Sequence, residues 1–152
     1  MQDEIENIEN DFIQLEKLNR FNWEPYAKLE VHPYQKEFIP DNLFSIAQSC
    51  FEPAELYGIS YKQKAVGLII INKWNNLYWI SRIMVDKNWQ NKGIGYYALQ
   101  QTIHLLKKRR DYQEIRTSIA VRNTQAQQFF KKVGFEFLHP IDEWEVMYVY
   151  RK

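Results

Sequence analysis

The chain has 152 residues, 45% of them hydrophobic and 26% charged, which is typical of one folded domain and excludes a disordered or low-complexity protein. Residues 1–60 contain twelve acidic and four basic residues, and residues 61–152 contain seven acidic and sixteen basic residues, so a net charge of +1 hides an acidic first part and a basic second part. The chain has one cysteine, Cys50, which excludes an internal disulfide and a cysteine-based zinc site. The acidic N-terminus and the short apolar runs predict neither a signal peptide nor a membrane helix. We therefore expect a cytoplasmic protein.

The first third of the chain predicts a strand followed by two short helices. Alternating apolar and polar residues at positions 12–18 are typical of a half-exposed strand. Prolines divide the next segment into two short helices, the second over residues 41–50 with Asp41 as its N-cap. We expect one domain over residues 12–152, preceded by a frayed acidic leader over residues 1–11.

The rest of the chain alternates strands with two longer helices. Apolar residues recur on one face of residues 93–110 and of residues 124–133, and Gly134 follows the second helix as a left-handed C-cap would. The predicted strands cover residues 56–61, 65–72, 77–85, 114–121, 135–138 and 146–151. This order predicts the α/β (α+β) class, with a mixed central sheet flanked by helices.

The segment over residues 83–95, in which a strand leads through a short loop into a helix, has features of an anion site. Gly93 and Gly95 remove side chains where a ligand approaches the backbone, and the first amides of the following helix have no partner within the helix. These amides and the helix dipole suit a pyrophosphate, and Lys92 adds a positive charge. The spacing matches neither a dinucleotide fold nor a P-loop, so NAD and ATP are poor candidates. Taken alone, a Gly-x-Gly sequence is explained equally well by a tight turn.

Two motifs in this order resemble those of the GNAT superfamily of N-acetyltransferases. Gln90-x-x-Gly93-x-Gly95 is similar to the family's Q/R-x-x-G-x-G/A loop, which binds the pyrophosphate of coenzyme A. Residues 123–135 resemble the family's N-x-x-A-x-x-[L/F]-Y-x-x-x-G-F segment. The resemblance covers roughly residues 12–152 and implies the GNAT fold, with acetyl-CoA as co-substrate. The cofactor-binding residues that it implies are Ile83, Met84, Val85, Gln90, Asn91, Lys92, Gly93, Ile94, Gly95 and Asn123.

The chain departs from the family pattern at Phe130. Many GNAT enzymes have a tyrosine here that returns a proton to the departing thiolate, and phenylalanine has no such proton. A positioned acid contributes about 10²–10⁴-fold to a rate, so its loss need not abolish catalysis. The resemblance therefore leaves the catalytic acid unassigned, and the apolar stripe of the helix is an alternative explanation for Phe130.

The acceptor is expected to be a small cationic amine that attacks the thioester directly. Acidic residues outnumber basic residues in the segment that would flank the acceptor. Residues 35–48, 78–86 and 145–147 also resemble the bacterial spermidine/spermine (diamine) N-acetyltransferase branch. We therefore take Glu37, Glu52 and Arg82 as candidate substrate-binding residues, with a polyamine as the acceptor.

Several alternatives remain open at this point. The acceptor could instead be a protein N-terminus or an amino sugar, and Phe130 favours a non-catalytic acetyl-CoA sensor. A basic cluster at 107–110 is the one feature in favour of nucleic-acid binding, which the acidic part of the chain and the absence of a recognition motif disfavour. The histidines are scattered without metal-ligand spacing, so we expect no metal site. No membrane partner is expected, and a homodimer is left open.

Overall fold

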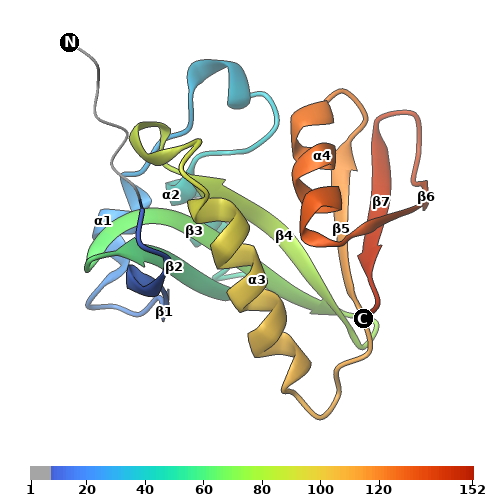
Figure 1. The fold of residues 1–152 in the computed structure, drawn as a ribbon, viewed down its shortest axis with the longest axis horizontal. Coiled ribbons are helices and arrows are strands. Elements are labelled where there is room, and N and C mark those ends of the chain that lie inside the picture. Colours follow the sequence, from blue (N-terminus) through green and yellow to red (C-terminus); the bar gives the residue numbers. More distant parts are fainter. Residues whose placement is uncertain (1–7) are drawn as a thin grey trace.

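The computed structural model describes residues 8–152, which form a curved seven-stranded sheet with helices on both faces (Figure 1). The strands are β1 (Ile13–Lys17), β2 (Glu55–Tyr61), β3 (Lys64–Trp74), β4 (Leu77–Val85), β5 (Ile115–Ala120), β6 (Glu136–Pro140) and β7 (Glu145–Tyr150). The helices are α1 (Trp23–Ala27), α2 (Asn42–Gln48), α3 (Ile94–Lys107) and α4 (Thr124–Val133), with 3-10 turns at Asn10–Phe12, Pro33–Gln35 and Lys87–Trp89. Within residues 8–152, no helix has the length and apolar character needed to cross a membrane.

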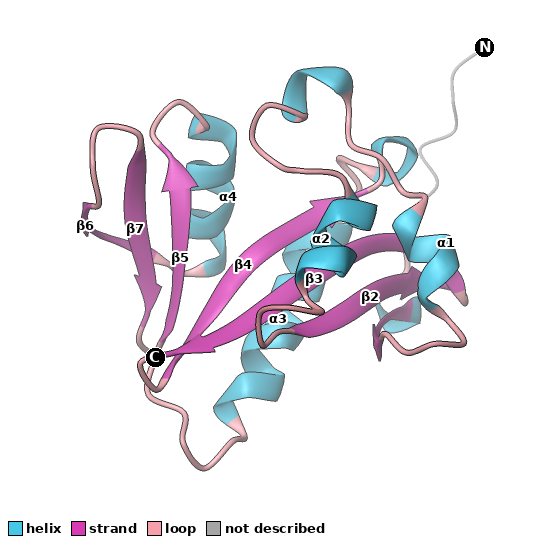
Figure 2. Cartoon of the chain, turned by 180° about the vertical axis from the view of Figure 1, so that it is seen from behind, coloured by secondary structure: helices cyan, strands magenta, loops and turns pink. Residues whose placement is uncertain are grey.

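The sheet divides into two arms between β4 and β5. The strand order is β1-β2-β3-β4-β5-β7-β6, and every neighbouring pair is antiparallel except β4 and β5. These two parallel strands pair only at Tyr78 with Ile115 and at Trp79 with Arg116, and then diverge (Figures 1 and 2). From residue 80 to residue 85, β4 therefore pairs with a described strand along one edge only. On its other edge the Ile80 carbonyl accepts a hydrogen bond from the Thr117 hydroxyl and the Val85 carbonyl accepts one from the Gln90 side chain, and the backbone between them has no strand partner within residues 8–152.

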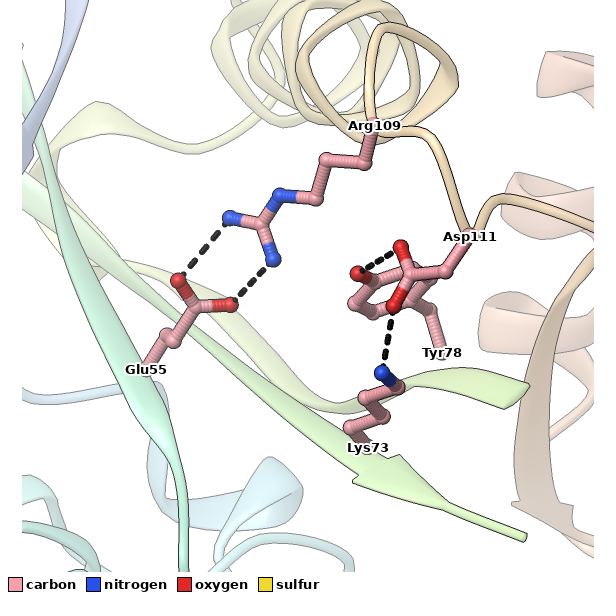
Figure 3. Close-up of polar contacts among 5 residues, drawn as sticks. All are labelled: Glu55, Lys73, Tyr78, Arg109 and Asp111. Atoms are coloured by element: carbon pink, nitrogen blue, oxygen red, sulfur yellow. Dashed lines mark hydrogen bonds and ion pairs between the residues drawn. The ribbon is translucent and has the colours of Figure 1, made fainter. Parts of the chain in front are cut away.

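A polar cluster holds the arms together at the end where β4 and β5 still pair (Figure 3). The guanidinium of Arg109 donates two hydrogen bonds to the Glu55 carboxylate, at 2.7 and 2.8 Å. The carboxylate of Asp111 accepts hydrogen bonds from the Tyr78 hydroxyl, at 2.7 Å, and from the Lys73 ammonium. These contacts attach the turn between α3 and β5 to β2, β3 and β4. The two arms are thus fastened at one end and separate at the other.

The main core lies between the sheet and the helices α3 and α4. The buried face of α3 follows the predicted helical stripe and contains Ile94, Ala98, Leu99, Ile103 and Leu106. A smaller core on the opposite face of the sheet lies beneath the segment that carries α1 and α2 (Figure 2), and its buried residues are Leu68, Ile70 and Met84. The position of α3 against β1 and β4 brings its N-terminus to the open end of the gap.

All the predicted elements are present, with small shifts at their ends. The helix predicted over 93–110 covers Ile94–Lys107, because Gly93 is a left-handed N-cap and the chain turns after residue 107 to form the polar cluster. Asp41 caps α2 by accepting a hydrogen bond from the Phe44 amide at 2.8 Å, as predicted. Gly134 has a φ of 120° and ends α4, also as predicted. The predicted leader falls partly outside the described residues, so the domain boundary remains a prediction.

Candidate functional site

The loop between β4 and α3 has a backbone that presents amides at the start of a helix. Gly93 has a φ of 84°, and a Cβ placed there would meet no atom within 4 Å. The glycine is therefore explained by its left-handed conformation and not by crowding within the protein. Asn91 is also left-handed, with a φ of 61°. Gly95 differs, because its Cβ would lie 3.4 Å from Val85 Cγ2 and 3.6 Å from the Phe129 ring, which are ordinary van der Waals contacts that a small side chain could also make.

This loop suits an anionic ligand for two reasons. The first amides of α3 have no carbonyl partner within the helix, and the positive end of the helix dipole lies beside them. Lys92 is half-buried in the same loop. Lys92 also lines a cavity of about 410 Å³ together with Trp89 and Lys64, the first residue of β3, which the sequence did not indicate as a site residue. The Lys64 ammonium lies 5.5 Å from the centre of the Trp89 ring, so two lysines contribute positive charge near the loop.

Gln90 has a positioning role through its side chain. Its amide nitrogen donates hydrogen bonds to the Val85 carbonyl at 2.9 Å and to Gln35 Oε1 at 2.8 Å. Gln35 donates in return to Gln90 Oε1 at 3.1 Å. Both amide hydrogens of Gln90 are thus engaged, and the side chain joins the end of β4 to the 3-10 turn at Pro33–Gln35. Direct contact between Gln90 and the coenzyme remains a prediction.

Asp86 is a further positioning residue that the sequence reasoning did not identify. Its carboxylate is buried, and it accepts hydrogen bonds from the Glu30 amide at 2.9 Å and from the Asn88 amide at 3.1 Å. It therefore fixes the start of the loop to the segment before α2. The local signal was present, because an aspartate directly after a strand is a common cap of the following turn.

The strand segment predicted to contact the coenzyme borders the gap between the arms. Ile83 and Val85 pack on the main core beneath α3, whereas Met84 lies in the smaller core on the other face. A bulge at Ser81 changes the register, so Ile80 and Ile83 face the same side of the sheet. The structure thus brings residues 83–85 and the loop over 90–95 together at the open end of β4.

The second motif lies on the other side of the gap, at the start of α4. Asn123 Oδ1 accepts a hydrogen bond from the Ala126 amide at 3.1 Å and so caps the helix. Phe130 is only 5% exposed, and its ring packs edge-on against Phe129 and Phe135, with ring centres 5.4 and 5.1 Å apart. Helix capping therefore accounts for Asn123, and core packing accounts for Phe130. Their predicted proximity to the coenzyme remains a prediction.

Arg82 projects from β4 toward α2 and has an unusual environment. Its guanidinium donates a hydrogen bond to the Ser45 hydroxyl at 2.8 Å, and no described carboxylate lies within 4.0 Å of it. Partial burial lowers the pKa of Arg82, and the negative charge of Glu52 acts in the opposite direction. Glu52 is exposed and lies within 3.5 Å of the Gln48 amide nitrogen. Arg82 and Glu52 therefore each contact a residue of α2, whereas Glu37 pairs with Arg122 in the turn before α4.

The acidic first part of the chain has fewer unpaired carboxylates to attract cations than its composition suggested. Three of its six carboxylates between residues 23 and 56 form ion pairs with basic residues from later in the chain. These pairs are Glu30 with Lys87 at 3.4 Å, Glu37 with Arg122 at 3.2 Å and Glu55 with Arg109 at 2.7 Å. The two parts of the chain thus neutralise one another across the fold, and fewer carboxylates remain for an acceptor.

Comparison with known proteins identifies the family. Residues 15–135 match the model of the acetyltransferase (GNAT) family. The chain belongs to this family. The prediction made from the two motifs is therefore confirmed at the level of the superfamily.

Solved structures confirm the fold of this GNAT protein. A GNAT family acetyltransferase from Elizabethkingia anophelis with acetyl-CoA bound has a TM-score of 0.70 and 20% identity, covering 93% of this chain and 99% of that one. A Bacillus subtilis acetyltransferase in complex with CoA has a TM-score of 0.72 and 18% identity, covering 92% and 99%. The ligands of these two structures agree with the prediction of acetyl-CoA as co-substrate.

A curated relative gives limited information on the acceptor. The chain is 31% identical over 68 residues to a probable spermine N(1)-acetyltransferase from Bacillus subtilis subsp. natto. This match covers 45% of the present chain and 45% of the relative, so it spans less than half the length of that protein.

Proposed function

We propose that this protein transfers the acetyl group of acetyl-CoA to a primary amine of a small polyamine such as spermidine or spermine. The observation that carries the proposal is the open end of the gap, where the unpaired edge of β4 meets the N-terminus of α3. A backbone edge and a helix start are suited to an extended amide-containing arm and to a pyrophosphate, respectively. When bound, acetyl-CoA supplies an acetyl group activated as a thioester.

In this proposal the residues of the loop and of β4 hold the coenzyme in place. The α3 amides and Lys92 bind the pyrophosphate, while the left-handed Gly93 leaves room for it. The edge of β4 over residues 83–85 aligns the arm that carries the thioester. The neutral acceptor amine forms the new nitrogen–carbon bond as the carbon–sulfur bond breaks, coenzyme A departs as the thiolate, and the nitrogen then loses its extra proton to water or to a protein base. An aliphatic amine has a pKa of about 10, so it must lose a proton before it attacks.

The polyamine acceptor is supported by the partial match to a probable spermine acetyltransferase. It is also supported by carboxylates on the acceptor side that form no ion pair with a described residue, such as Glu24 and Glu52. A small polycation would be attracted to these groups, and salt would weaken the attraction.

The test is a thiol-release assay with acetyl-CoA and a panel of polyamines, amino sugars, amino acids and peptides. We expect the highest kcat/KM with spermidine or spermine, and we expect this value to fall as the salt concentration rises. Turnover of an amino sugar or a peptide without turnover of either polyamine would show that the acceptor is wrong. Tight binding of acetyl-CoA by calorimetry without any turnover would indicate a sensor.

Arg82 favours a second candidate acceptor. Its half-buried guanidinium has a hydroxyl partner and no carboxylate within 4.0 Å among the described residues. A partly buried guanidinium without a carboxylate partner in hydrogen-bond range is stabilised by an added anion. An amine that also carries a carboxylate, such as an amino acid or an acidic peptide, would supply one. The same panel distinguishes the two candidates, because Arg82→Gln should impair acetylation of the carboxylate-bearing amine and spare that of the polyamine.

A further inference from the structure

Residues 33–41, which we call the strap, connect the two sides of the open gap. At one end Gln35 is paired with Gln90, in the loop that follows β4. Two residues later, Glu37 Oε2 lies 3.2 Å from Arg122 Nη2, in the turn between β5 and α4. Figure 1 shows the same arrangement, with the strap before α2 extending toward the start of α4. Among the described residues, the strap thus contacts both segments that carry the coenzyme motifs.

The Glu37–Arg122 pair lies at the mouth of the gap and is open to solvent. The side chain of Arg122 is 72% exposed and that of Glu37 is 54% exposed. Exposed ion pairs contribute little to stability, because water and salt screen them and two long side chains must be ordered. Another cation can therefore replace Arg122 as the partner of Glu37 with little loss of stability.

Of the two carboxylates in the strap, Glu37 is the one that can bind an added cation. The carboxylate of Asp41 is occupied as the N-cap of α2, where it accepts a hydrogen bond from the Phe44 amide. Lys36 is exposed and forms no ion pair within the described residues. A cation that reaches the strap from the gap can thus pair with Glu37, whose partner in the absence of such a cation is Arg122.

We propose that Glu37 binds the distal ammonium group of a polyamine acceptor, and that Arg122 is the counter-ion which this ammonium displaces. The inference rests on the proposed function, because a second positive charge is what a polyamine offers and a monoamine lacks. The reacting amine must be neutral when it attacks near β4, whereas the distal amine stays charged and needs an anionic partner. Glu37 is thus a specificity residue that distinguishes polyamines from monoamines.

The test compares Arg122→Gln and Glu37→Gln with the unmodified protein, using spermidine and butylamine as acceptors. The readout is the ratio of the KM for spermidine to the KM for butylamine at low salt. We expect Arg122→Gln to lower this ratio by about two- to fivefold, since it removes a weak competing pair, and Glu37→Gln to raise it. The double variant should behave like Glu37→Gln alone, because Arg122 acts only through Glu37.

Lys36→Gln is the matched control, because it removes a neighbouring positive charge of the strap that has no ion-pair partner in the described part of the chain. We expect no change in the ratio for this variant. If the ratio falls equally for Lys36→Gln and Arg122→Gln, the effect comes from the loss of a positive charge in general, and the inference is wrong.

Two other outcomes separate this inference from the proposed function. If the unmodified protein acetylates spermidine but Arg122→Gln leaves the ratio unchanged, or raises the KM for acetyl-CoA instead, the inference is wrong and the proposed function stands. If the unmodified protein acetylates no polyamine, both are wrong. Circular dichroism of each variant shows that it is folded.

Discussion

Replacing Gly93 with alanine tests whether the start of α3 is the pyrophosphate site. The residue has a φ of 84°, a conformation that costs an L-residue about 1–2 kcal/mol relative to glycine. A Cβ at this position meets no protein atom within 4 Å, so we expect no further loss of stability from crowding. In a domain of 152 residues this corresponds to a fall in Tm of about 2–8 °C.

The new methyl group would stand where the coenzyme approaches the helix amides. Loss of a hydrogen bond to a charged group costs about 1.5–3 kcal/mol, so the affinity for acetyl-CoA should fall by about ten- to a hundredfold. Isothermal titration calorimetry measures this affinity, and a thermal melt of the same sample measures the stability.

Gly134→Ala is the matched control. Gly134 also has a positive φ, of 120°, and ends α4, where a Cβ would lie 3.2 Å from the Tyr150 ring. We expect this variant to lose at least as much stability as Gly93→Ala and to keep its affinity for acetyl-CoA. The assignment is refuted if folded Gly93→Ala binds acetyl-CoA as tightly as the unmodified protein, or if the control loses affinity to the same extent.

Three further predictions concern the polar cluster and Phe130. Glu55→Gln should lower the free energy of unfolding by about 1–2 kcal/mol, because it breaks a partly exposed bidentate pair with Arg109, and the affinity for acetyl-CoA should not change. The hydrogen bond from Lys73 holds the pKa of Asp111 below its usual value. The ionised Asp111 therefore stabilises the fold above a pH of about 4, and this contribution is lost as the pH falls through the lowered pKa. Asp111→Asn should flatten the dependence of Tm on pH in that acidic range. Phe130→Tyr places a hydroxyl in the core and should lower the free energy of unfolding by about 1–3 kcal/mol. A rise in kcat without loss of stability would instead place the residue at the coenzyme sulfur.

The sequence predicted the elements of the fold because their signals are local. The stripe of apolar residues in α3 repeats with the period of one helix, and Asp41 and Gly134 mark helix ends by interactions within a few residues. The shift at the C-terminal end of α3 has a distant cause. Arg109 was predicted to be helical and instead turns toward Glu55, which lies 54 residues earlier in the chain.

In the candidate site, too, the features with local signals could be predicted and the contacts with distant residues could not. The glycines of the loop could be identified because a Gly-x-Gly pattern is local, and the positive φ of Gly93 is a property of a single position. The contact of Gln90 with the coenzyme stays a prediction, and no local pattern indicated that its side chain also binds Gln35, at a separation of 55 residues. The composition likewise indicated six acidic residues near the acceptor, and it could not reveal which of them have basic partners.

By itself, the sequence determined the order of strands and helices, the position of the glycine loop before α3 and the family, since each depends on residue types at short and regular spacing. Only the tertiary structure decided that β4 and β5 separate after two residue pairs and that Arg122 neutralises Glu37 across 85 positions. Strand pairing and ion pairs of this kind join residues far apart in the chain, and their energies depend on the packing of the whole domain. The gap that holds the candidate site is a product of those distant contacts.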